Sequence, residues 1–289
     1  MTTKAVSTKD ISELRARTSA GMMDCKVALE EAGGDLDKAA EILRKKGIAK
    51  AEKRGGRVAA QGLVVIASHG AGDMTMIELD CETDFVVRTE EFGNLARELA
   101  AHAARQAPTG VHPGSALDSQ PFAGRTVAEA IKELAAKTGE ATTLRRVARL
   151  AQPNGTVQSY LHHNGQVGVL VELEGPGGDA LVELGRELAL HIASADPIGV
   201  SETDIPGEVL ERERRIAEEQ VAAGGKPEAI RPKIVAGKLR KFVGERTLLG
   251  QPFVKDETRT AGDLVKTAAQ TLGGPVTVRR FARFKVGEA

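Results

Sequence analysis

Apolar residues at helical spacing predict three short helices within residues 1–54. In the second of them, Cys25, Ala28 and Leu29 follow the i, i+3, i+4 spacing that places apolar side chains on one helix face. Gly47 stands where a left-handed residue would end the third helix. Because such a bundle has a small core, we expect it to be marginally stable by itself.

Alternating apolar and polar residues, separated by turn signals, predict strands after this bundle. The predicted strands cover residues 63–68, 74–80, 142–151, 157–163, 166–173 and 276–286. Amphipathic helices are predicted between them, and Thr126 is expected to cap one of these helices. Residues 109–125, rich in Pro, Gly and Ser, are predicted to form a loop.

An internal repeat divides the middle of the chain into two related α+β subdomains. Residues 94–104 match residues 183–193 at an offset of 89, and residues 77–79 match residues 171–173 at an offset of 94. The first copy therefore carries about five more residues between its strand and its helix, within residues 81–88. Since function concentrates in loops on rigid scaffolds, this junction is a candidate site.

A second similarity links the two ends of the core. Residues 143–150 and 277–284 both read Thr-x-Arg-Arg-x-Ala-Arg, followed by an apolar residue. We expect these segments to be strands in similar sheet positions, so that the C-terminal segment returns to the core.

The stretch from Val200 to Gly244 differs in character from its surroundings. Seven of the nine residues from 211 to 219 are charged, and apolar positions are sparse. Gly and Pro interrupt the stretch at residues 224–227, and a second helical pattern follows. Two helices with a thin apolar seam and charged flanks predict a protruding antiparallel hairpin.

Composition excludes several classes of function. The chain has 40 Lys and Arg against 40 Asp and Glu, whereas dedicated nucleic-acid binders carry a basic balance. Aromatic residues make up only 3%, too few for base-stacking platforms. No window approaches the roughly 20 apolar residues of a membrane helix. We therefore expect no direct contact with nucleic acid or membrane.

Candidate catalytic chemistry is sparse. No hydrolase nucleophile elbow, phosphate-binding loop, dinucleotide fingerprint or zinc-protease helix motif occurs. His162 and His163 are adjacent on a predicted strand, so they would point to opposite faces and cannot readily share a metal ion. We expect no catalytic residue, metal ion or cofactor.

The two cysteines, Cys25 and Cys81, are too few for a disulfide framework and indicate a reducing cytoplasm. Cys81 has carboxylate neighbours at Glu82 and Asp84, which would raise the pKa of its thiol rather than lower it. A packed, reduced thiol is favoured, and a thiol enzyme built on Cys81 stays as an alternative.

Phe85 lies in the inserted junction of a chain that uses aromatic residues sparingly. One interpretation is that its ring covers the local core. The other is that it projects as an aromatic anchor into a partner's pocket, because such residues dominate interface energetics. Spacing alone leaves both open.

The motifs along the chain resemble those of the bacterial elongation factor Ts family. The matching segments are Leu14-Arg-x-x-Thr18, Gly21-Met-Met-Asp-Cys-Lys26, Ala28-Leu29, Glu78-Leu79, Cys81-Glu-Thr-Asp-Phe-Val86, Arg145-Arg146, Gly250-Gln-Pro-Phe-Val-Lys-Asp256 and Arg283-Phe-x-Val-Gly-Glu288. The resemblance covers nearly the whole chain. Val87, where the family often has Ala, and the basic strand from Arg145 to Arg149 depart from it slightly.

The resemblance implies an α+β fold in five parts. These are a ubiquitin-associated-like helical domain (1–54), a core N-subdomain with the Thr-Asp-Phe-Val motif (55–140), a core C-subdomain (141–199), an antiparallel coiled-coil arm (200–244) and a C-terminal module that returns to the core (245–289). The core subdomains are expected to hold antiparallel sheets.

The resemblance also implies a function, namely guanine nucleotide exchange on the GTPase elongation factor Tu in its GDP-bound and nucleotide-free forms. Phe85 is expected to wedge between two helices of that partner, and Asp84 to help displace the groups that hold Mg²⁺. The implied site residues are Thr83, Asp84, Phe85 and Val86, with further partner contacts at Lys26, Val167, Gly168 and His191. A non-exchanging adaptor that binds through its N-terminal bundle is a second alternative.

Overall fold

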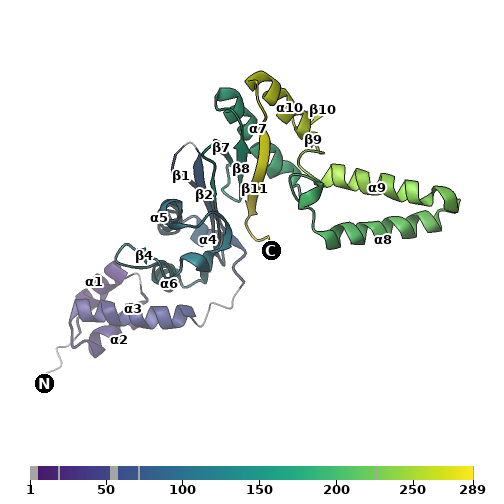
Figure 1. Cartoon of the computed structure of the whole chain (residues 1–289). Coiled ribbons are helices and arrows are strands. Elements are labelled where there is room, and N and C mark those ends of the chain that lie inside the picture. The colour runs from purple at the N-terminus through teal and green to yellow at the C-terminus, as the bar shows by residue number, and fades with distance from the viewer. Residues whose placement is uncertain (1–5, 19, 53–57, 71, 226, 289) are drawn as a thin grey trace.

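The computed structural model describes residues 6–18, 20–52, 58–70, 72–225 and 227–288, and Figure 1 shows their arrangement. An N-terminal helical bundle lies at one end, a layered core in the middle and a helical hairpin at the other end. Helices and antiparallel sheets make up the core, so the predicted α+β class is confirmed. The predicted boundary between residues 54 and 55 lies outside the described residues.

The N-terminal bundle consists of α1 (Thr8–Thr18), α2 (Met22–Glu31) and α3 (Leu36–Glu52). Its buried side chains are Ile11, Leu14, Cys25, Ala28, Leu29 and Ala39. Asp35 caps α3 by accepting hydrogen bonds from the backbone N–H groups of Asp37 and Lys38, each at 3.0 Å.

The prediction that Gly47 ends α3 was wrong, because the helix continues to Glu52. A Cβ atom at position 47 would lie 2.9 Å from Cβ of Ala136 on the core helix α6. Gly47 therefore permits close packing of α3 against the core rather than ending the helix.

Two antiparallel sheets form the core. Sheet one has the order β1-β2-β6-β3 and sheet two the order β11-β8-β7. The strands are β1 (Gln61–Ser68), β2 (Asp73–Cys81), β3 (Gly110–Pro113), β6 (Thr142–Ala151), β7 (Gly155–Leu161), β8 (Val167–Glu174) and β11 (Thr277–Lys285). Because β6 belongs to sheet one, the two sheets divide after residue 151, and the predicted subdomain boundary at residue 141 must be moved.

Four helices cover the outer faces of the sheets. Helices α5 (Glu90–Gln106) and α6 (Val127–Thr138) pack on sheet one, and α7 (Asp179–Ala195) and α10 (Ala261–Leu272) pack on sheet two. The inner faces of the two sheets pack on each other. That interface buries Val64, Met76, Ala148, Leu150, Val157, Leu170, Ala282 and Phe284. The core is thus a four-layer stack of helices, sheet, sheet and helices.

The predicted equivalence of the two Thr-x-Arg-Arg strands is confirmed. β6 pairs antiparallel with β2, and β11 pairs antiparallel with β8, in matching registers. Glu78 lies opposite Arg146 in the first pair, and Glu172 lies opposite Arg280 in the second. Both arginines form ion pairs with the carboxylates opposite them. The repeat therefore extends to the third strand of each subdomain, although the edge strand β3 of sheet one has no counterpart in sheet two.

The predicted loop over residues 109–125 is more regular than expected. It contains the edge strand β3, the 3₁₀ helix η1 (Gly114–Leu117) and the short pair β4 (Pro121–Phe122) and β5 (Arg125–Thr126). Pro113 ends β3 at the edge of the sheet, where a missing backbone donor is tolerated. The Gly- and Pro-rich composition therefore predicted a loop where the short strand β3 forms.

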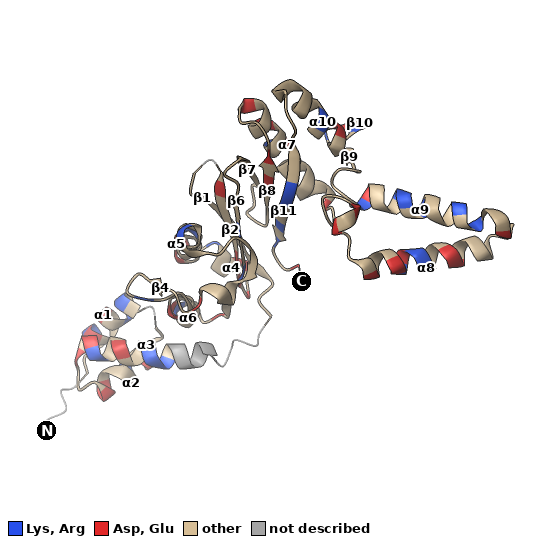
Figure 2. Ribbon diagram, in the orientation of Figure 1, with Lys and Arg blue, Asp and Glu red and all other residues tan. Residues whose placement is uncertain are grey.

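The arm consists of α8 (Gly207–Ala223) and α9 (Arg231–Arg246), side by side and projecting from the core (Figure 1). Its buried seam is thin, formed by Ala217, Val221 and Val235 with partly buried Ile234 and Leu239. Charged residues occur along both helices (Figure 2). The chain then forms β9 (Pro252–Phe253), β10 (Asp256–Thr260), α10 and β11. Within the described ranges no helix is both long and apolar enough to cross a membrane.

Candidate protein-binding site

The inserted junction folds as a single helical turn, α4 (Asp84–Val87), between β2 and α5. Thr83 is its N-cap, and the Thr83 hydroxyl accepts a hydrogen bond from the backbone N–H of Val86 at 3.5 Å. Val86 is buried against the core, whereas the Phe85 side chain is 78% exposed. Phe85 therefore does not cover the local core, and of the two interpretations of this ring the projecting anchor is retained.

Three hydrogen bonds tie this turn to the junction between α6 and β6. Glu140 accepts from Thr83 twice, from the backbone N–H at 3.0 Å and from the hydroxyl at 2.7 Å. In the reverse direction, Glu82 accepts from the backbone N–H of Ala141 at 2.7 Å. Sequence reasoning missed both glutamates because 57 residues separate Thr83 from Glu140.

Asp84 lies at the first position of α4 and forms an ion pair with Arg88 at 2.8 Å. Both side chains are substantially exposed, so solvent screens the pair and its contribution to stability is small. Arg88 was not among the predicted site residues. Its presence means that a partner which binds Asp84 must compete with this guanidinium.

Cys81 is fully buried at the end of β2, and its thiol donates a hydrogen bond to the backbone carbonyl of Thr83 at 3.2 Å. Burial, followed by the negative charge of Glu140, raises the pKa of this thiol to about 12. A buried thiol that stays protonated at neutral pH is a poor nucleophile. The geometry therefore favours the packed, reduced Cys81 over the thiol-enzyme alternative.

Lys26 lies on an exposed face of α2 in the N-terminal bundle. Its ammonium group is 3.9 Å from a carboxylate oxygen of Glu30. Met22, Met23 and Val27 are exposed on the same helix, with Met23 69% exposed. Scattered apolar residues are normal on a surface, but three on one short helix form a local apolar surface beside a cation.

His191 is fully buried and does not contribute molecular surface. The backbone N–H of Val254 donates to His191 Nδ1 at 3.3 Å, so Nε2 carries the proton and donates to Gln251 Oε1 at 3.1 Å. Burial lowers the pKa of this imidazole. Its repeat counterpart His102 pairs in the same way with Gln120 at 2.9 Å. The geometry therefore corrects the expectation of a direct partner contact at His191 and assigns it to internal packing.

Gly168 is also buried, at the interface between the two sheets. A Cβ atom there would lie 2.5 Å from Val64 Cγ1 and 2.8 Å from Met76 Sδ. Its neighbour Val167 is half-buried and lines a surface groove with Tyr160 and others. Of the two adjacent positions, only Val167 offers side-chain surface to a partner, which corrects the expectation for Gly168.

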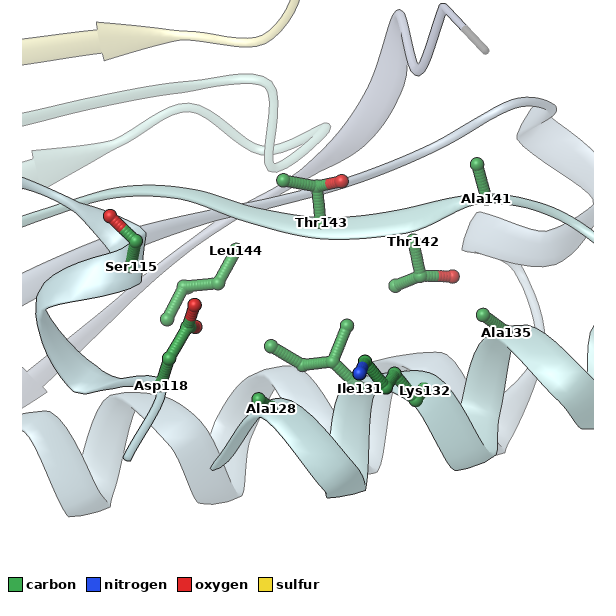
Figure 3. Close-up of a pocket in the computed structure, with 10 residues that line it drawn as sticks. All are labelled: Ser115, Asp118, Ala128, Ile131, Lys132, Ala135, Ala141, Thr142, Thr143 and Leu144. Atoms are coloured by element: carbon green, nitrogen blue, oxygen red, sulfur yellow. The ribbon is translucent and has the colours of Figure 1, made fainter. Parts of the chain in front are cut away.

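The described residues contain no group of three or more His, Cys, Asp or Glu side chains placed to hold a metal ion. A pocket of about 350 Å³ lies between α6 and the start of β6, closed at one side by η1 (Figure 3). Its charged lining residues are Asp118, whose pKa is raised by burial, and Lys132. None of the eight predicted site residues lines this pocket. The part of the candidate site on α4 is therefore a projecting surface apart from this pocket, whereas Val167 lines a separate groove.

An exposed aromatic ring on a short, tethered helix is the kind of site that acts by contact with another macromolecule. The family model described as Elongation factor TS matches residues 82–288. The elongation factor Ts of Aquifex aeolicus is 46% identical, with 98% of each chain covered, and that of Thermobifida fusca is 46% identical, with 97% of this chain and 98% of the relative covered. The elongation factor Ts of Alkalilimnicola ehrlichii is 44% identical over 98% of this chain and 93% of its own. The chain belongs to the elongation factor Ts family of translation elongation factors.

Proposed function

We propose that this chain binds elongation factor Tu in its GDP form, dislocates Mg²⁺ from the partner's nucleotide site and promotes exchange of GDP for GTP. The observation that carries the proposal is the Phe85 ring, 78% exposed on a turn whose other apolar residues, Val86 and Val87, pack against the core. An exposed aromatic ring that the fold holds in place can enter a pocket with little loss of conformational entropy.

The exchange step needs no catalytic side chain from this protein. A bound Mg²⁺ neutralises phosphate charge, so a shift in its coordination weakens the hold of the partner on the nucleotide. Phe85 would displace partner helices near the metal ion, and the adjacent Asp84 would compete for the groups that orient it. We accordingly propose that the chain is not an enzyme and acts by binding alone.

Linkage explains how such binding accelerates release. If a protein binds the nucleotide-free partner more tightly than the GDP-bound partner, it must weaken GDP binding to the partner by the same ratio. Displacement of a tight ligand requires a broad interface, above about 2,000 Å² in total. The exposed face of α2 with Lys26, the α4 turn and the groove at Val167 lie on separate parts of the molecule and together would supply such contact.

The proposed partner also places the activity in the cytoplasm, where translation takes place. Two buried, unpaired cysteines are compatible with a reducing compartment. A direct role in nucleic-acid binding is not part of the proposal, because the formal net charge is zero.

Release of labelled GDP from elongation factor Tu, measured by stopped flow, tests the proposal. The parent chain should accelerate release, and Phe85→Ala should reduce the maximal rate at least tenfold, since an interface anchor contributes about 2 kcal/mol or more. Val111→Ala, which truncates an exposed apolar residue on β3, is the matched control and should leave the rate unchanged. A parent chain that binds the partner without accelerating release would support the adaptor alternative instead.

A further inference from the structure

We propose that Glu140 is a positioning residue for the α4 turn, one that fixes the direction of Phe85 before the partner arrives. The inference rests on the proposed function for its biological meaning, but its structural content can be tested without the partner. Glu140 itself touches neither Phe85 nor Asp84 in any contact described above and acts through Thr83.

The first argument is the hydrogen-bond chemistry of Thr83. A threonine hydroxyl has one proton to donate and lone pairs to accept with. Here the proton is donated to Glu140 Oε1 at 2.7 Å, which turns a lone pair toward the N–H of Val86. The other oxygen of Glu140 accepts from the Thr83 backbone N–H at 3.0 Å. One carboxylate thus fixes both the backbone and the rotamer of the residue that caps α4.

The second argument is the shortness of α4. A four-residue helix contains one turn, and isolated helices of this length are unstable because nucleation is unfavourable. Val86, which is buried, and Val87, which is partly buried against the same core, anchor the second half of the turn and not its beginning. The bonds from Glu140 to Thr83, and from Ala141 to Glu82, are therefore the contacts that hold the beginning of the turn.

The third argument comes from the internal repeat, where the second copy serves as a natural comparison. The C-caps Gly139 and Gly273 follow α6 and α10, two helices with capping boxes at their starts, and both are left-handed, with φ of 78° and 67°. The next residue is Glu140 in the first copy and Gly274 in the second. The second copy lacks the inserted turn: its strand ends at Glu174 and its helix begins at Asp179.

The geometry at Gly274 explains this difference. A Cβ atom at position 274 would lie 2.8 Å from Cγ of Pro176, which belongs to the short junction of the second copy. Position 274 therefore contacts its strand-to-helix junction directly, without a side chain. In the first copy the junction is longer, and the same position carries a carboxylate that reaches it by hydrogen bonds. The acid and the inserted turn occur together in one copy and are absent together from the other.

We call the two hydrogen bonds from Thr83 to Glu140 the clamp. Loss of the clamp should loosen the turn without unfolding the core. Phe85 would then sample several directions, and only a fraction of molecules would be competent to bind. Apparent affinity falls in proportion to that fraction, while the rate from the fully bound complex is retained. We expect Glu140→Ala to raise the half-saturating concentration in GDP release about fivefold to tenfold, with the maximal rate within about twofold of the parent.

The control variants separate positioning from general damage. Glu140→Gln keeps one acceptor oxygen and should give an intermediate shift, and Thr83→Val should reproduce the Glu140→Ala shift by removing the hydroxyl. Glu187→Ala truncates another half-buried glutamate, paired with Lys255 in the second subdomain, and should cause no shift. In a Phe85→Ala background, Glu140→Ala should add nothing, because its effect passes through the ring.

A test without the partner uses the absence of tryptophan from the chain. Phe85→Trp introduces a sole tryptophan, and time-resolved fluorescence anisotropy reports its local motion. Adding Glu140→Ala or Thr83→Val should enlarge the fast-decaying part of the anisotropy, with the thermal melting of the core unchanged. Equal anisotropy decays in the presence and absence of the clamp would overturn the inference. A parent chain that fails to accelerate GDP release would instead overturn the proposed function and leave this measurement standing.

Discussion

At the scale of single residues, two carboxylates on β2 are buried in the core, which is unfavourable unless they are paired. Glu78 and Asp80 are both buried on the face of β2 that is turned toward sheet two. A β-bulge in β6 brings Arg145 and Arg146 toward them, with Arg146 paired to Glu78 and Arg145 3.8 Å from Asp80. One oxygen of Asp80 has no hydrogen-bond partner within the described part of the chain. Burial, followed by the charge of Glu78, raises the pKa of Asp80 from 3.8 to about 7.

This shift predicts how stability depends on pH. Between pH 3.8 and about 7 the folded state keeps a proton on Asp80 that the unfolded state has released, so this group lowers stability as pH rises through that window. Asp80→Asn removes the ionisable group. It should stabilise the chain relative to the parent at pH 8 by about 1–3 kcal/mol, with a smaller gain at pH 5.

Urea unfolding at the two pH values measures the effect. Glu174 is the counterpart of Asp80 in the second copy, and its side chain is 44% exposed. Glu174→Gln is the control and should change the free energy of unfolding little at either pH, because water already solvates the charge of Glu174. A gain from Asp80→Asn that is equal at pH 5 and pH 8 would contradict the assignment.

At the scale of elements, the arm is attached to the core by its two ends and stabilised along its length by its own seam. At the base, the backbone N–H of Ile198 donates to Arg246 at 2.9 Å, and that of Leu248 donates to Gly199 at 2.9 Å. These bonds bring the beginning and the end of the arm side by side. The buried seam of the arm is therefore separate from the core cluster at its base, and the arm adds little to that core.

Shortening the arm should leave the core folded. Replacement of residues 211–241 by a turn of about four residues keeps both helix ends and the bonds at the base, and loses the buried seam. The melting temperature of the remaining chain should stay within about 4 °C of the parent, the shift that roughly 1 kcal/mol produces in a chain of this size. Loss of a cooperative melting transition in differential scanning calorimetry would show that the arm is part of the core.

At the scale of the whole molecule, the fold is a duplication. Its two copies share a hydrogen bond between a buried histidine and a glutamine and differ in the segments that project from the core. His102 with Gln120 and His191 with Gln251 occupy matching positions. The first copy alone has the inserted α4 turn, and the second alone has the arm, between α7 and β9. The shared sheets supply a rigid scaffold, and the two insertions supply the exposed surfaces.

The interface between the sheets depends on close approach at Gly168. Gly168→Leu should destabilise the chain by about 1–3 kcal/mol, because the side chain would overlap Val64 and Met76. Gly177→Ala is the control, since nothing lies within 4 Å of a Cβ atom there. Guanidinium unfolding of both variants gives the comparison, and a loss no larger than that of Gly177→Ala would argue against tight packing of the sheets at this point.

Prediction from the sequence succeeded where structure follows from local spacing. The strand over residues 142–151 was predicted with its observed bounds, and the helix capped at Thr126 begins with a capping box to Glu129. It failed where a distant contact overrides a local signal. Gly47 lies inside its helix, where it permits close packing against Ala136, and residues 110–113 form a strand because β6 offers an open edge.

The candidate site was predicted in part. Composition and the repeat pointed to the turn at Phe85, because an insertion in one of two copies can be detected by comparing their sequences. The roles of Glu140 and Arg88 were not foreseen, since a hydrogen bond across 57 residues leaves no periodic signal. His191 and Gly168 were expected at the partner surface, and burial places them inside.

The sequence by itself determined the order of the longer helices and strands, the duplication, the charged hairpin and the family, since each of these follows from spacing or from motifs within one segment. Only the tertiary structure decided that Phe85 projects while Val86 is buried, and that Glu140 accepts two hydrogen bonds from Thr83. The physical reason is that burial and hydrogen-bond partners depend on which distant segments share a face. That pairing is set by the packing of two sheets and their helices, which local spacing does not specify.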